Sequence, residues 1–155
     1  MTIVENHIEN LIHNTITIES KVFCENVFVA KSSFSNDVTG DFDGAFAKKD
    51  FVEGELVERG VMRRLPDGFD GNKCPYIFTW SAERPNHVWA MGSGCSPFYN
   101  TNKEDVANTR MVRYFDEDRF EIFATRDIKA GEELTHTYIS LRWRECFSEL
   151  SSILA

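Results

Sequence analysis

The residue types best suited to chemistry lie near the C-terminal end of the chain. His136 and Tyr138 fall in residues 134–139, which have the composition of a β-strand, and side chains two residues apart in a strand point to the same face. A histidine there can tune the local charge because it titrates near neutral pH, and a tyrosine carries one polar group on an apolar ring. The plainer interpretation is a tyrosine with its ring in the core and its hydroxyl in water, beside a structural histidine.

Glycine and cysteine patterns exclude several other kinds of site. The run Gly-Ser-Gly-Cys at 92–95 has no third glycine, no Gly-Lys-Ser and no strand-to-helix context, so we reject a phosphate loop and a nucleophile there. The four cysteines lie far apart and form no Cys-x-x-Cys pair, so we expect no metal site. Reduced thiols suit the cytoplasm.

Short strands dominate the pattern around these residues. The clearest signal is a hairpin of residues 111–115 and 119–125, joined by Asp116-Glu117-Asp118. Residues 141–154 have an uneven apolar face and are the best helix candidate. We expect further strands at 15–30, 46–51, 56–62 and 134–139, an extended segment at 75–80, and an irregular segment or helix end at 89–100.

Two stretches of ten residues repeat without a gap. Residues 46–55 match residues 123–132 at Phe, Ala, Asp, Gly and Glu. In each copy a strand ends in Ala, a basic residue precedes Asp, and a glycine turn starts the next strand. The Asp can bond backbone amides in the loop, and the glycine can take a positive φ that other residues resist. The repeat predicts a fold that uses the same corner twice.

Three blocks of sequence resemble the SET-domain family of protein-lysine methyltransferases. The most specific block is Ala-Thr-Arg-Asp-Ile-Lys-Ala-Gly-Glu-Glu-Leu-Thr at 124–135, closed by Tyr138. The upstream copy, within residues 44–57, resembles the family's opening strand pair and cofactor-binding turn. Between them, Phe-Tyr-Asn-Thr-Asn at 98–102, followed by Asn108, lies where the family has its Asn-His motif and a later Pro-Asn.

The resemblance covers roughly residues 20–147, and it implies a mainly β fold of the β-clip type. This is the SET-domain fold of short curved sheets, with a knot-like C-terminal segment and a few short helices. Residues 1–19 would be an N-terminal extension and residues 148–155 a C-terminal tail. Cysteine-rich zinc modules that flank larger relatives are absent, so the chain is similar to the minimal SET domains of viruses, phages and some bacteria.

The resemblance also implies an activity, which is transfer of a methyl group from S-adenosylmethionine to a lysine side chain. Tyr138 would be catalytic, with its hydroxyl near the sulfonium and the lysine nitrogen, and His136 would line the substrate channel. A structural role is the alternative for several of the implied cofactor residues, such as a turn at Gly44 or Asn100 and core packing at Trp143. The cofactor-binding residues implied by the family pattern are Gly44, Ala45, Phe46, Tyr99, Asn100, Thr101 and Trp143.

The chain departs from the family pattern at the cofactor-binding motifs. Phe42-Asp43-Gly44 supplies only the second glycine of the usual Gly-x-Gly, and Asn100-Thr101 stands in place of Asn-His. These departures motivate a second hypothesis, in which the chain is a catalytically weak or inactive SET-like module that binds a peptide. In a third hypothesis only the Asp-Gly-Glu corner is meaningful. Such a corner also occurs in other small domains with a similar arrangement of strands, and Tyr138 would then have no functional role.

Composition and charge set the expected partners. The 155 residues have the length of one domain, and 42% are hydrophobic, with 13 Phe, which is enough to fill a core. No apolar run approaches the roughly 20 residues that span a membrane, and the polar N-terminus has no secretory signal. The net charge of −8 disfavours direct nucleic-acid binding and favours a lysine-containing basic protein or peptide, such as a segment of a histone or ribosomal protein. A homodimer is left open.

Overall fold

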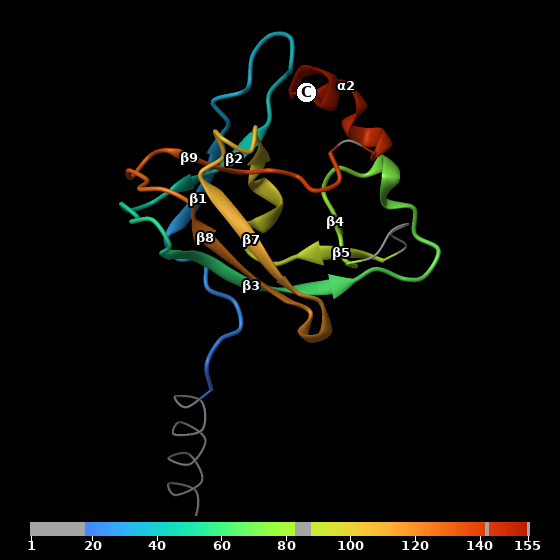
Figure 1. The fold of residues 1–155 in the computed structure, drawn as a ribbon, viewed down its shortest axis with the longest axis horizontal. Helices are drawn as coiled ribbons and strands as arrows, with labels where there is room; N and C mark the ends of the chain where they lie inside the picture. Colours follow the sequence, from blue (N-terminus) through green and yellow to red (C-terminus); the bar gives the residue numbers. More distant parts are fainter. Residues whose placement is uncertain (1–17, 83–87, 142, 155) are drawn as a thin grey trace, which may run out of the picture.

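The computed structural model describes residues 18–82, 88–141 and 143–154, which form two curved β-sheets joined by short helical turns (Figure 1). One sheet has four strands in the order β1-β2-β9-β6, and the other has five in the order β4-β5-β3-β8-β7. Within the sheets only β6 and β9 pair in parallel. The strands are β1 Val27–Lys31, β2 Asp43–Ala47, β3 Leu56–Arg64, β4 Phe78–Thr79, β5 Trp89–Gly92, β6 Asn100–Thr101, β7 Thr109–Tyr114, β8 Arg119–Ala124 and β9 Glu133–His136.

The predicted hairpin is confirmed. β7 and β8 pair along their whole length and are joined by η3 (Phe115–Glu117) and Asp118, which takes the left-handed conformation with φ 49°. The fold is mainly β, as predicted, with few and short helices. The remaining helical segments are η1 Gly71–Lys73, η2 Ser96–Phe98, η4 Glu145–Phe147 and α2 Ser148–Leu154.

Several predicted boundaries were wrong. The predicted helix at 141–154 is a turn followed by η4 and α2, so the regular helix begins only at Ser148. The segment 89–100, expected to be irregular or a helix end, contains β5 and η2 and ends at the start of β6. The strand predicted at 15–30 is regular only from Val27. Residues 1–17, which make up nearly all of the predicted N-terminal extension, and residues 83–87 lie outside the described residues.

The repeated corner is used twice, and the two copies bind each other. Gly54 N–H donates to the carbonyl of Ala124, and Gly131 N–H donates to the carbonyl of Ala47, both at 2.8 Å. Both glycines have positive φ, 85° and 90°, as the sequence predicted. The two aspartates also cross over: Asp50 accepts from Ala130 N–H, and Asp127 from Glu53 N–H, so each ties the loop of the other copy. The corner therefore joins β2 and β3 to β8 and β9 through reciprocal bonds.

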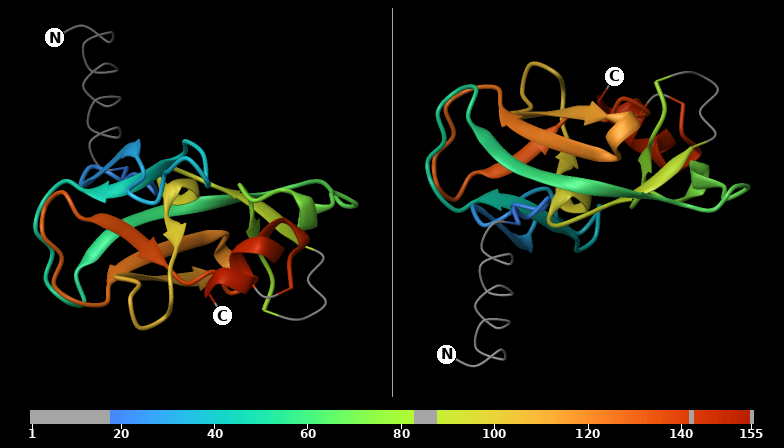
Figure 2. Two further views of the ribbon diagram at one scale, coloured as in Figure 1. Left: turned by 90° about the horizontal axis from the view of Figure 1, so that it is seen from above. Right: turned by 90° about the horizontal axis from the view of Figure 1, so that it is seen from below.

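The hydrophobic core lies between the two sheets. Figure 2 shows β1 and β2 (blue to teal) on one side of the long strand β3 (green) and the C-terminal segment (red) on the other. The two corners meet in this core through a bridge between Phe51 and Ile128, which are 2% and 1% exposed. Burying two large apolar side chains at the pairing point stabilises both corners and, through them, fixes where β9 begins.

The described residues also bear on metals and membranes. No helix among them is long and apolar enough to cross a lipid bilayer. They do not bring together three or more His, Cys, Asp or Glu side chains in the manner of metal ligands. The four cysteines are all described; each is half-buried and free of disulfide bonds.

Candidate active site

Tyr138 follows β9 and is held at both its backbone and its hydroxyl. The hydroxyl donates a hydrogen bond of 2.7 Å to the carbonyl oxygen of Tyr99, and the backbone N–H donates to Thr101 Oγ1 at 3.1 Å. Burial raises the pKa of Tyr138 above its ordinary value, so the phenol stays protonated at neutral pH. Because the hydroxyl proton points to Tyr99, the oxygen lone pairs can still accept a hydrogen bond from another group.

His136, the last residue of β9, lies against two tyrosine rings. Its ring centroid is 5.8 Å from that of Tyr99, nearly parallel, and 5.2 Å from that of Tyr138, edge-on. Burial, assisted by the positive charge of Arg113, lowers the pKa of His136 to about 3, so the imidazole is neutral. Its Nδ1 is buried and has no hydrogen-bond partner within the described part of the chain. His136 and Tyr138 therefore lie together, as their spacing predicted.

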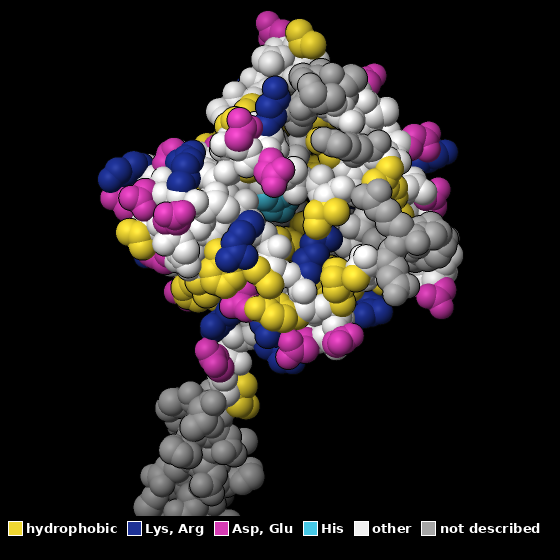
Figure 3. Space-filling model, in the orientation of Figure 1, with side chains coloured by type: hydrophobic (Ala, Val, Ile, Leu, Met, Phe, Trp, Pro, Cys, Tyr) yellow, Lys and Arg dark blue, Asp and Glu magenta, His cyan; other side chains and the backbone are white. Residues whose placement is uncertain are grey.

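These rings line a cavity that contains about 390 Å³ of empty space, part of it open to solvent. Its walls come from residues 75–79, η2, β7 and the segment that runs from β9 to η4. Figure 3 shows the histidine colour as a small area near the centre of one face, between hydrophobic and basic side chains; the one described histidine is His136. The lining side chains that matter for chemistry are Tyr99, Arg113, His136, Tyr138, Arg144 and Phe147.

Two arginines bring positive charge to the cavity. Arg113 Nη1 donates to the carbonyl of Thr79 at 2.8 Å, and the guanidinium of Arg144 lies 4.8 Å from the centre of the Phe147 ring. In each arginine the Nε is buried and lacks a partner among the residues described. Burial lowers the pKa of Arg113 to about 10, which leaves it charged at neutral pH. A neutral ligand group is therefore favoured over a cationic one in this cavity.

Asn100, next along the chain from Tyr99, belongs to a second polar cluster. Its Nδ2 donates to Glu133 Oε2 at 3.1 Å and to the carbonyl of Asp43 at 3.2 Å. The backbone of Gly44 lies against this cluster, since a Cβ there would come 2.6 Å from Glu133 Oε2 and 3.1 Å from Asn100 Nδ2. A side chain at this position would therefore displace the Glu133 carboxylate or the Asn100 amide.

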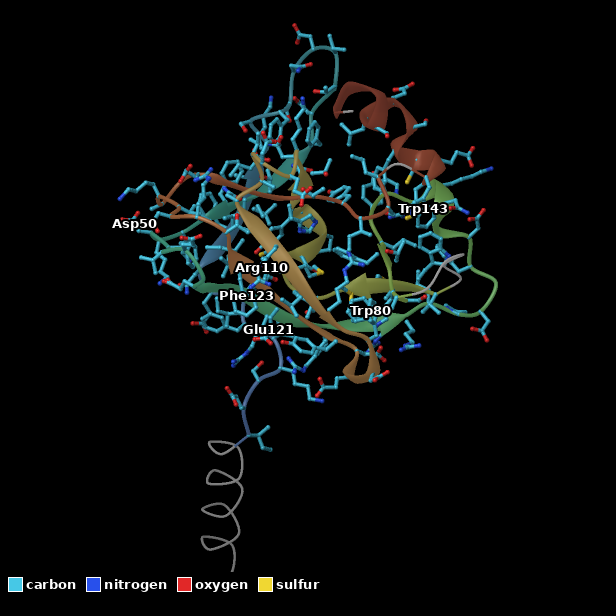
Figure 4. The ribbon with its side chains drawn as sticks, viewed as in Figure 1. Asp50, Trp80, Arg110, Glu121, Phe123 and Trp143 are labelled. Atoms are coloured by element: carbon cyan, nitrogen blue, oxygen red, sulfur yellow. The ribbon has the colours of Figure 1, made fainter. Side chains whose placement is uncertain are left out.

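The other residues implied by the family pattern have different surroundings. Ala45 is fully buried in the core, and Phe46 stacks on Phe28 with ring centroids 5.5 Å apart. The ring of Trp143 lies 6.3 Å from that of Trp89 and does not line the cavity. Figure 4 shows Trp143 near the C-terminal segment, far from Asp50 at the corner. The predicted site residues therefore have three kinds of surroundings. Some line the cavity, some belong to the polar cluster of Asn100 and Glu133, and Ala45, Phe46 and Trp143 make packing contacts.

The ring of Phe147 packs against that of Tyr138 at the wall of the cavity. Its ring centroid is 5.1 Å from that of Tyr138, and the ring is 5% exposed. The family pattern pointed to Trp143 as the cofactor-binding aromatic residue of this segment, but the aromatic ring that packs against Tyr138 is that of Phe147 in η4.

Two further buried polar residues belong to the site: Asn108, which lies at a position of the family pattern, and Glu58, which was not predicted from the sequence. Asn108 is 2% exposed; its Nδ2 donates to the carbonyl of Glu133 and its Oδ1 accepts from Thr135 N–H, both at 2.8 Å. Glu58, on β3, has no exposed surface and accepts a hydrogen bond of 2.8 Å from the Tyr99 hydroxyl. The available signal for Glu58 was a carboxylate directly after Leu56 and Val57 in a predicted strand, which is weak because Arg59 follows it.

The sequence model of the SET domain family matches residues 43–139, which is more than half of the chain. The chain belongs to the SET domain family. The matched range runs from β2 to the residue after Tyr138, so it contains both copies of the corner, the polar cluster and the cavity residues Tyr99, His136 and Tyr138. The SET-domain fold and family predicted from the sequence are therefore confirmed.

This SET domain is similar in sequence to a histone-lysine methyltransferase. It is 30% identical over 154 residues to the histone-lysine N-methyltransferase EZH2 of Chaetomium thermophilum, an alignment that covers 86% of this chain and 10% of that protein. The chain therefore spans about a tenth of the length of this relative.

Two solved structures resemble the SET domain. The Polycomb Repressive Complex 2 of C. thermophilum bound to GSK126 matches with a TM-score of 0.56 and 26% identity, over 83% of this chain and 17% of that one. The same complex in an autoinhibited conformation, bound to S-adenosylmethionine, shares the fold with a TM-score of 0.58 and 24% identity, over 84% and 17% of the two chains.

Proposed function

We propose that this SET domain is an S-adenosylmethionine-dependent protein-lysine N-methyltransferase that acts on a basic protein segment. The observation that carries the proposal is the fixed phenol of Tyr138, whose hydroxyl proton is committed to the Tyr99 carbonyl inside a cavity beside a neutral histidine. Similarity to EZH2 supports the same chemistry.

The polar cluster fits the amino-acid end of the cofactor. Gly44 leaves a cradle that a Cβ would fill, and the amide of Asn100 and the carboxylate of Glu133 lie at its edge. A carboxylate and an amide oxygen suit an ammonium group. Asn100 Nδ2 is already engaged, so the Oδ1 on the other arm of the amide is the atom that would accept from it.

The cavity residues would orient and neutralise the attacking amine. When bound, the cofactor supplies an electrophilic methyl group on a sulfonium. Arg113 and Arg144 favour a lysine side chain that has released its proton to water before it enters, because a third positive charge would be repelled. The Tyr138 oxygen can then accept an N–H of the neutral amine and turn the nitrogen lone pair toward the methyl group.

The substrate class follows from charge. The chain carries a net charge of −8, and a protein segment rich in lysine and arginine would be attracted to it over several ångströms. The relative EZH2 is named a histone-lysine methyltransferase, so a histone tail is one candidate substrate. A basic segment of a ribosomal protein has the same chemistry and is another. Either would bring one lysine to the mouth of the cavity.

A second candidate function is a SET-like module that binds peptide without transferring methyl groups. Two features favour it: Phe42 replaces the first glycine of the cofactor turn, and the Asn100 amide already bonds Glu133 and Asp43. Calorimetry with S-adenosylmethionine separates the two functions, because such a module would bind a basic peptide and give no heat with the cofactor.

The test uses the whole chain with tritiated S-adenosylmethionine and a mixture of core histones and ribosomal proteins. We expect label in a lysine of at least one of these proteins, and a loss of about 100-fold or more in rate for Tyr138→Phe. Affinity for the cofactor should change little, because the phenylalanine ring still fills the wall. Equal rates for the wild type and Tyr138→Phe would refute the role of Tyr138. No label in any protein of the mixture would refute the activity on basic proteins.

A further inference from the structure

Glu58 is a buried carboxylate that is hydrogen-bonded to Tyr99, one of the residues that line the cavity. It has no exposed surface, and it accepts hydrogen bonds from the Tyr99 hydroxyl at 2.8 Å and from Cys95 N–H at 2.9 Å. Glu58 forms no ion pair with any described lysine or arginine. A buried carboxylate without a counter-ion is stabilised only by the groups that donate hydrogen bonds to it. Losing one of these bonds would be costly, so the donor groups are also held in position.

Tyr99 makes a different contact through each of its parts. The hydroxyl donates to Glu58, the carbonyl oxygen accepts from Tyr138, and the ring stacks on His136. The residue is fully buried, and the pKa of its hydroxyl is raised well above the ordinary value, so it remains a donor at all working pH values. A shift of the Tyr99 hydroxyl therefore displaces the acceptor of Tyr138 and the ring beside His136.

We propose that Glu58 is a positioning residue for methyl transfer: its carboxylate fixes Tyr99, and the carbonyl of Tyr99 in turn fixes the hydroxyl of Tyr138. The inference rests on the proposed methyltransferase function. Glu58 neither lines the cavity nor contacts Tyr138, and the bond from the Tyr99 hydroxyl links it to the residue whose carbonyl holds Tyr138.

The arrangement makes the site sensitive to pH. Burial raises the pKa of Glu58 to about 7, and the bonds from Tyr99, Cys95 N–H and Ser96 N–H oppose this rise. The other ionisable groups around it are the thiols of Cys95 and Cys24, and the pKa of Cys95 is raised to about 12, so that thiol is neutral. Below pH 7 the carboxyl gains a proton and loses its charge and part of its acceptor capacity, so the hydrogen bond that positions the Tyr99 hydroxyl weakens.

The first test compares the pH dependence of kcat for the wild type and for Glu58→Gln, with methyl transfer measured on a basic peptide. The ratio of wild-type to variant kcat cancels the ionisation of the substrate lysine. We expect this ratio to rise about tenfold between pH 6 and pH 8, as the carboxyl passes from mostly protonated to mostly ionised. A ratio that stays constant across this range would overturn the inference, because a merely structural glutamate lowers kcat equally at every pH.

Two further variants sharpen the test. Tyr99→Phe removes the hydroxyl through which Glu58 would act, so the pH-dependent rise in kcat should disappear in this variant; a rise that persists contradicts the inference. This variant also serves if Glu58→Gln does not fold. Glu53→Gln is the matched control, since Glu53 is an exposed glutamate in the corner turn, and it should follow the wild type throughout.

A readout without catalysis separates this inference from the proposed function. In protein with ¹³C-labelled tyrosine rings, the Tyr138 signal should move with a midpoint near pH 7 in the wild type and stay fixed in Glu58→Gln. If the chain transfers no methyl group but this titration is present, the proposed function fails and the coupling stands. If the titration is absent from the wild type, the coupling itself is refuted.

Discussion

Arg113 and Arg144 donate to carbonyl groups two residues apart in one segment of chain. Arg113 Nη1 bonds the carbonyl of Thr79 at 2.8 Å, and Arg144 Nη1 bonds the carbonyl of Ile77 at 3.1 Å. The segment has little regular structure of its own, because β4 comprises two residues. Two buried cations, one from β7 and one from the C-terminal segment, therefore hold this wall of the cavity in place.

Replacing Arg144 should destabilise the whole domain. Its Nη2 also donates to the carbonyls of Gly71 and Cys74, so Arg144→Gln leaves three buried carbonyls short of a donor. We expect the free energy of unfolding, measured by urea titration, to fall by about 3 kcal/mol.

Lysine at the same position keeps the charge but cannot span three acceptors, so Arg144→Lys should lie between the wild type and Arg144→Gln. Arg126→Gln is the control, because the Arg126 side chain is 50% exposed and its loss should cost less than about 0.5 kcal/mol. A loss below about 1 kcal/mol for Arg144→Gln would show that water replaces the guanidinium.

His136 should make stability depend on pH. The folded protein holds the pKa of His136 at about 3, whereas an unfolded chain takes up this proton near pH 6.5. Its contribution is complete above pH 6.5 and declines as pH falls below that value, by about 1.4 kcal/mol per pH unit until about pH 3.

The measurement is the difference in unfolding free energy between the wild type and His136→Phe at several pH values. Glu58 titrates in part of the same range, but it is present in both proteins and cancels in the difference. The advantage of the wild type should shrink by about 2 kcal/mol between pH 6.5 and pH 5. Parallel curves would mean that His136 is protonated at its ordinary pKa in the folded state.

Gly44→Ala should weaken cofactor binding more than it weakens the fold. The new Cβ would press on the carboxylate of Glu133 and the amide of Asn100, and both side chains would have to move out of the cradle. We expect affinity for S-adenosylmethionine, measured by calorimetry, to fall about tenfold or more. Asp43→Ala is the control, because only the backbone carbonyl of Asp43 takes part in the cluster. Equal affinities for Gly44→Ala and the wild type would place the cofactor elsewhere.

The repeated corner and the hairpin were accessible from the sequence because local residue types determine them. Glycine at a positive φ and an aspartate beside it are local signals, and they predicted both corners. The partner of each aspartate was not predictable, because Asp50 and Asp127 bond the opposite copy of the loop. That exchange depends on the two copies meeting in space, which no local pattern encodes.

Glu58 and Trp143 show two physical reasons why the site was only partly predicted. The register of β3 shifts between Leu56 and Glu58, so the consecutive residues Val57 and Glu58 are both fully buried and the alternation of faces fails. Trp143 and Phe147 would share a face in a helix, but the chain turns before η4, and only Phe147 reaches Tyr138. At both places the prediction failed because the backbone is irregular, and not because the residue types were misjudged.

Salt should weaken catalysis on a basic peptide if charge brings the substrate to this SET domain. The net charge of −8 acts over a distance that salt shortens, from about 30 Å at 0.01 M to about 8 Å at physiological ionic strength. We expect kcat/KM for a lysine- and arginine-rich peptide to fall about tenfold over this range, with kcat nearly unchanged, because the field affects encounter and not the buried cavity. A peptide with a single lysine in a neutral context is the control and should respond little. The same weak response from the basic peptide would leave the acidic surface without a role in substrate capture.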